Sequence, residues 1–182
     1  MPKSLILSAI AISTLAFAVS ANAETAKPAA SASDNYFEVG GGAARVSGEN
    51  FGTVNFTLGK TLNQSFAAEL EGQVGVTSKS YYYGGNKVKA QVDYALAAYA
   101  VGTLPVSADT DLIGRVGYMT AEAKVAASGA SATDMEFGPA YGVGIRYFPK
   151  GGDAGVRFDI THFDLSHDLN GDLYQVSYIR RF

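Results

Sequence analysis

A mildly acidic chain of 182 residues without cysteine excludes several classes of protein at the outset. The formal net charge of −3 and the lack of any basic run give no electrostatic basis for binding nucleic acid. The missing cysteines exclude disulfides and thiolate metal sites, so the chain must be stabilised in another way.

The N-terminal 23 residues have the pattern of a secretory signal peptide. Lys3 precedes an apolar run from Leu5 to Val19, and the small residues Ala21 and Ala23 form a cleavage sequence. A transmembrane anchor is the alternative, but this run is shorter than the roughly 20 residues that a spanning helix needs. We therefore expect residues 1–23 to be removed. Residues 24–34, which are small, polar and proline-containing, are predicted to form a flexible periplasmic leader.

After the leader, apolar and polar residues alternate with a period of two, which predicts β-strands. In the stretch 65–76, for example, Leu70 and Val74 share one face while Glu69 and Glu71 share the other. No apolar stretch after the signal peptide approaches the length of a spanning helix, so a membrane location would require strands. Eight strands are predicted, at 36–46, 51–60, 65–76, 87–103, 111–122, 136–148, 154–163 and 173–182.

The predicted connections alternate between short turns and longer loops. The short turns are expected at 61–64, 104–110 and 149–153, and the longer loops at 77–86, 123–135 and 164–172; the connection at 47–50 is a short one on the long-loop side. With an even number of strands, both termini of an up-and-down barrel lie on the side of the short turns. The sequence therefore predicts an all-β protein, with an eight-stranded antiparallel up-and-down transmembrane β-barrel at 35–182.

The direction of the apolar face distinguishes this barrel from a soluble periplasmic lipocalin-like carrier. In such a carrier the apolar face would be inside. A membrane barrel inverts that arrangement. Aromatic residues at strand ends, suited to interfacial girdles, favour the inverted form: Phe37, Phe66, Tyr118, Phe137, Tyr147, Tyr174 and Phe182. The polar faces carry charges that could pair across a lumen, with Glu38, Glu69, Glu71, Asp93 and Asp159 against Lys87, Lys89, Arg115, Arg146 and Arg157. Glycines on those faces give the long side chains room: Gly40, Gly42, Gly117, Gly142 and Gly144.

The last three predicted strands resemble a known family. The stretch GPAYGVGIRYFPKGGDAGVRFDITHFDL, followed by LYQVSYIRRF, is similar to the end of the small eight-stranded outer membrane barrels of the outer membrane protein A and opacity type. GRVGYM at 114–119 is similar to their fifth strand. This chain departs from the family pattern at Arg180, a position where the family usually has an aromatic or apolar residue. The peptidoglycan-binding domain of its larger members is not expected here.

The resemblance also implies partners and site residues. It implies a monomer in the cell outer membrane, among lipids and lipopolysaccharide. Insertion would be catalysed by the barrel assembly machinery, which reads the final strand. The matching assembly residues are Tyr174, Val176, Tyr178 and Phe182. It further implies lumenal salt bridges between Glu69 or Glu71 and the arginines Arg115, Arg146 and Arg157.

Three functions are compatible with such a barrel. A non-enzymatic surface protein would act through its loops, where Tyr81, Tyr82 and Tyr83 are candidate contacts, unless they only extend the aromatic girdle. A narrow channel is an alternative, although side chains can fill an eight-stranded interior. A surface lipid-modifying enzyme would need a Ser–His pair with an orienting acid, and the two histidines, His162 and His167, do not provide that spacing. No cofactor or metal is predicted, because the acidic stretch 164–172 lacks the distal glutamate of a calcium loop.

Overall fold

The computed structural model describes residues 35–182 apart from 47, 84–85, 128–129 and 167–168. At 79–83, 86–92, 123–127 and 130–134 it describes the backbone only. The predicted signal peptide and leader lie outside the described residues. Within the described part of the chain, no helix has both the length and the apolar character needed to cross a membrane.

The described chain is almost entirely antiparallel β-strand. The strands are β1 (Asn35–Val46), β2 (Glu49–Thr61), β3 (Phe66–Gly75), β4 (Ser78–Tyr83), β5 (Asn86–Pro105), β6 (Thr110–Ala127), β7 (Ala130–Tyr147), β8 (Ala154–Leu165) and β9 (Leu169–Arg181), with one 3₁₀ turn, η1 (Pro149–Gly151). Strands that are neighbours in chain order pair with each other, except that β3 pairs with β5 in place of β4, and β1 also pairs with β9. These pairings close the sheet into a barrel of eight strand positions, as the sequence predicts.

The strands β3 and β4 share one position in the barrel, because both pair with β5. The prediction of a loop at 77–86 is therefore wrong: Ser78–Tyr83 pairs with Asn86–Gln91 as a hairpin. The predicted loops at 123–135 and 164–172 are also mostly strand, since β6 continues to Ala127 and β8 to Leu165. The physical reason is that two paired strands that continue past the end of the barrel can still form hydrogen bonds between their backbone N–H and C=O groups.

The two faces of the barrel carry opposite chemistry. Charged residues such as Arg157 and Glu69 are almost completely buried, whereas Leu70 and Phe137 are each 65% exposed on the outside. The aromatic residues Tyr118, Tyr147, Tyr174, Tyr178 and Phe182 are also exposed. The polar face therefore points inward, which is the inverted arrangement and excludes the lipocalin-like alternative.

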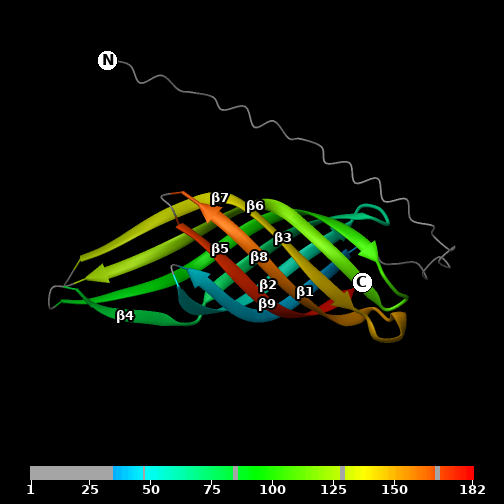
Figure 1. Ribbon diagram of the computed structural model, residues 1–182, viewed down its shortest axis with the longest axis horizontal. Helices are drawn as coiled ribbons and strands as arrows, with labels where there is room; N and C mark the ends of the chain where they lie inside the picture. The colour runs from blue at the N-terminus through cyan, green and yellow to red at the C-terminus, as the bar shows by residue number, and fades with distance from the viewer. Residues whose placement is uncertain (1–34, 47, 84–85, 128–129, 167–168) are drawn as a thin grey trace, which may run out of the picture.

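The two ends of the barrel differ in how far the strands reach. At one end the chain closes on itself, because the Phe182 N–H donates to the Asn35 carbonyl oxygen over 2.9 Å. At the other end, the hairpins β4–β5 and β6–β7 extend past the ends of β8 and β9, on the left in Figure 1. The short turns, the start of β1 and the C-terminus thus lie together, and the long hairpins project from the opposite end.

Apolar side chains fill the lumen toward both ends. Near the termini lie Tyr36, Phe148 and Ile113, and toward the long hairpins lie Phe163 and Leu173, all of them buried. The buried charged residues occupy the space between these two layers, because the inward positions of the central strand segments are glutamate, aspartate and arginine. The candidate site is therefore a polar layer enclosed in the middle of the barrel.

Candidate functional site

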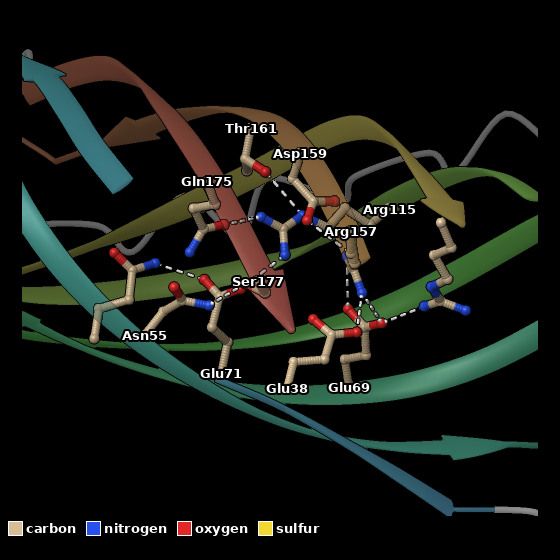
Figure 2. A network of polar contacts seen from close by, with 12 residues as sticks. Glu38, Asn55, Glu69, Glu71, Arg115, Arg157, Asp159, Thr161, Gln175 and Ser177 are labelled. Carbon is tan, nitrogen blue, oxygen red and sulfur yellow. Dashed lines mark hydrogen bonds and ion pairs between the residues drawn. The ribbon is translucent and has the colours of Figure 1, made fainter. Parts of the chain in front are cut away.

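Arg157 on β8 is the centre of the lumenal network, and no part of its side chain is exposed. Its Nη1 donates to Glu69 Oε1 over 2.6 Å and to Glu38 Oε1 over 2.7 Å. Its Nε donates to Asp159 Oδ2 over 2.7 Å (Figure 2). One guanidinium thus hydrogen-bonds to carboxylates from three strands, β1, β3 and β8, which links distant parts of the barrel wall.

A second arginine shares the Glu69 carboxylate. Arg146 Nη2 on β7 donates to Glu69 Oε1 over 2.7 Å and to the Tyr36 hydroxyl oxygen over 3.0 Å. The Tyr36 hydroxyl in turn donates to Glu69 Oε1 over 2.6 Å. The Arg146 guanidinium also lies 4.8 Å from the centre of the Tyr36 ring, a cation–π arrangement. The ring of Tyr36 covers Gly59 on β2, so a side chain at position 59 would displace it.

Arg115 on β6 organises the neighbouring part of the layer. Its three donor nitrogens each meet a different side chain at 2.8 Å: Nη1 meets Glu71, Nη2 meets Gln175 and Nε meets Thr161. The guanidinium also lies 4.5 Å from the centre of the Tyr99 ring. Arg115 is therefore held from strands β3, β5, β8 and β9, and its charge is paired by Glu71.

Most of the charges predicted for the lumen meet in this network. Glu38, Glu69, Glu71 and Asp159 face Arg115, Arg146 and Arg157. Asp93 lies half-buried at a bulge in β5 between Val92 and Tyr94. The side chains of Lys87 and Lys89 lie outside the described residues. Among the described side chains, these ion pairs join four acids to three arginines.

Sequence reasoning missed the neutral members of the network. Tyr36, Thr161 and Gln175 each make one or more of its hydrogen bonds. All three occupy the same face of their strands as the charged residues, so the period-two pattern was the signal that could have found them. Neutral residues are easily missed, because nothing in the sequence marks them as needing a partner and their partners lie on strands far away in sequence.

We expect Tyr36→Phe to destabilise the barrel by about 1–3 kcal/mol, because Glu69 and Arg146 each lose a buried hydrogen-bond partner. Urea unfolding in phospholipid vesicles would measure this change. The matched control is Tyr174→Phe, which removes a hydroxyl from an exposed outer position. Equal stability of the two variants would show that the Tyr36 hydroxyl contributes nothing to the network.

The outer face holds the four predicted assembly residues. Tyr174, Val176, Tyr178 and Phe182 lie on β9 or at its end and are 42–61% exposed. The Phe37 ring lies 6.2 Å from the Phe182 ring and 6.4 Å from the Tyr178 ring, which joins the first and last strands at the girdle. Arg180 is also exposed, at the end where a lipid-facing arginine can reach headgroups.

The remaining candidates lie toward the long hairpins. His162 Nδ1 lies 2.9 Å from Asp172 Oδ1, and its ring lies 5.3 Å from that of Tyr141. Tyr81, Tyr82 and Tyr83 belong to β4, and their side chains lie outside the described residues. His167 is also outside them. Among the described residues, no three His, Asp or Glu side chains are grouped as a metal site.

A closed barrel with its apolar surface outside and its ion pairs inside defines the class of membrane-embedded β-barrels. The family model described as the outer membrane protein beta-barrel domain matches residues 9–182. The chain therefore belongs to the outer membrane β-barrel domain family, and it is located in the outer membrane. A search of the curated proteins found no match.

Solved structures show the same fold. The attachment invasion locus protein Ail of Yersinia pestis, solved with the heparin analogue sucrose octasulfate, is 17% identical with a TM-score of 0.60; the match covers 81% of this chain and 97% of Ail. Neisserial surface protein A is 12% identical with a TM-score of 0.63, covering 84% and 100%. The N-terminal barrel of Pseudomonas aeruginosa OprF is 9% identical with a TM-score of 0.61, covering 83% and 99%.

Proposed function

We propose that this protein is a non-enzymatic surface barrel whose long hairpins bind molecules outside the cell. The observation that carries the proposal is the length of β5, β6 and β7, which have 20, 18 and 18 residues. A tilted strand needs only about 9–11 residues to cross a bilayer. The excess length lies at the end away from the termini, so these strands support a sheet that stands above the membrane.

The composition of this protruding sheet, defined here as 78–92 and 122–136, favours anionic partners. Its four lysines, at positions 79, 87, 89 and 124, outnumber its three acids, Glu122, Asp134 and Glu136, and the stretch 78–92 holds three of the lysines, three consecutive tyrosines and no acid. Register brings them onto adjacent strands, because Ser80 pairs with Lys89 and Gln91 pairs with Lys124. Lysines supply charge and tyrosines supply rigid contact area, a combination suited to sulfated or phosphorylated sugars. Ail, which shares the fold, was solved with such a ligand.

The test uses the protein in phospholipid vesicles with sucrose octasulfate and heparin as probes. We expect salt-sensitive binding of heparin that weakens about fivefold to tenfold when Lys87 and Lys89 are both changed to alanine. A triple change of Tyr81, Tyr82 and Tyr83 to serine should weaken it further. The control is Lys60→Ala, since Lys60 is an exposed lysine near the terminal end of β2. Absence of binding, or equal loss in the control, would leave a mainly structural role in the envelope.

A narrow channel is supported less well than surface binding. The arginine and carboxylate side chains fill the middle of the lumen, and buried apolar residues lie at both ends of it. Ion passage would require several of the short ion pairs to open together, which is unfavourable in a low-dielectric interior. The expected single-channel conductance in planar bilayers is therefore close to the baseline.

The final strand is proposed as the signal for the barrel assembly machinery. The outward direction of Tyr174, Val176, Tyr178 and Phe182 supports this role, because a recognising protein could read these side chains before they meet lipid. The surrounding partners are proposed to be outer membrane lipids and lipopolysaccharide, which would contact the exposed apolar face.

A further inference from the structure

The protruding sheet has two free edges. Its strand order is β7-β6-β5-β4, and β4 is the last strand of the order. Among the described residues, β4 pairs only with β5. The pairs between β7 and β8 begin at Ala140, and one further backbone bond joins Ser166 to Phe137. Among the residues that the structure describes, 130–135 of β7 have a ladder partner only on the β6 side.

Free edges of this kind attract another strand, because each presents unpaired backbone N–H and C=O groups. Natural edges are commonly protected by proline, by β-bulges and by charged side chains such as lysine. Neither edge contains proline or glycine, since β4 reads SKSYYY and residues 130–135 read ASATDM, and each carries a single charge, Lys79 in β4 and Asp134 in β7. The two edges also have equal length, with six residues in β4 and six at 130–135 of β7.

We propose that the partner is a second copy of this chain, with β4 of one copy pairing with β7 of the next. Every copy in one membrane stands the same way up. In each copy β4 runs away from the end that holds the termini, and β7 runs back toward it. A β4–β7 contact between copies is therefore antiparallel, whereas β4–β4 and β7–β7 contacts would be parallel and slightly less stable.

The charges of the two edges also match. In the register that pairs all of β4, Ser78 lies opposite Met135 and Tyr83 lies opposite Ala130. Lys79 then lies opposite Asp134, and opposite charges at facing positions stabilise a strand pair. This contact is head-to-tail, so it leaves one free edge at each end and forms open rows of barrels rather than closed dimers. The monomer expected from the sequence would be the unit of such a row.

The lack of cysteine in the chain allows a clean cross-linking test. Ser80 and Thr133 face each other in this register, at a separation that a disulfide can bridge. We expect S80C and T133C proteins, carrying different tags and mixed in one membrane, to form a disulfide-linked heterodimer under mild oxidation. Within one chain the two positions are separated by β5 and β6, about 14 Å at the usual strand spacing, so an internal disulfide is excluded.

The matched control mixes S80C with A126C, because Ala126 lies in β6, an interior strand of the same sheet. No heterodimer is expected there, nor from S80C or T133C alone. Adding Lys79→Glu should lower cross-linking about twofold to fivefold, and Asp134→Lys on the partner should restore it. Heat-dependent mobility in dodecyl sulfate confirms that each variant is folded. The proposal is overturned if the mixed pair gives no heterodimer, or if S80C alone cross-links as well as the pair does.

Discussion

Replacing Arg157 by methionine is expected to destabilise the barrel by about 3–5 kcal/mol, the largest loss for any single lumenal substitution. The variant leaves Glu38, Glu69 and Asp159 without the guanidinium that contacts all three. A buried carboxylate cannot turn to water, so the loss of its partner exposes the full desolvation penalty. Urea unfolding in phospholipid vesicles, followed by mobility in dodecyl sulfate without heating, measures the effect.

Two further variants make the Arg157 result interpretable. Arg180→Met removes an exposed arginine from the adjacent strand β9 and should change stability by less than about 0.5 kcal/mol. Arg157→Lys retains the positive charge but loses the fork of donors, so an intermediate stability is expected, and this variant should fold even if the methionine variant does not. Similar unfolding midpoints for Arg157→Met and Arg180→Met would contradict a stabilising role for the network.

Changing Gly117 to alanine should cost about 3 kcal/mol, although alanine normally suits a strand better than glycine. A Cβ at this position would overlap the carbonyl oxygen of Ala98 and the backbone of Tyr99. These atoms belong to β5, the strand paired with β6, so relief requires the two strands to move apart. That movement would also disturb Arg115, which lies two residues away and contacts the Tyr99 ring.

The control for Gly117 is present in the same strand. A Cβ at Gly114 would meet nothing within 4 Å, and Gly114 is exposed on the outer face. Gly114→Ala is therefore expected to be neutral or to stabilise by a few tenths of a kcal/mol, through the lower entropy of the unfolded chain. If both alanine variants unfold at the same urea concentration, the close approach of β5 and β6 at Gly117 has no energetic consequence.

The sequence by itself determined the class of fold and the direction of its faces. A period of two places alternate residues on opposite faces of any strand, so Glu69 and Glu71 had to share a face opposite Leu70. Apolar residues such as Leu70 and Phe137 then had to meet lipid once the polar face was enclosed. The family resemblance of the last strands pointed to the same class, which the match over residues 9–182 shows.

Only the tertiary structure decided which charges meet and where the hairpins end. Arg157 and Glu69 are 88 residues apart, and their contact depends on the order and register of strands around the whole barrel. The local conformational preferences of the residues carry no information about contacts between strands so far apart in the sequence. The same limit explains the errors at 77–86 and 123–135, where polar and small residues suggested loops but backbone pairing across the hairpin sustains strands. The free edges of β4 and β7 likewise arise because the neighbouring strands end closer to the barrel than β4 and β7 do. The strand ends depend on the assembled barrel and cannot be read from local sequence.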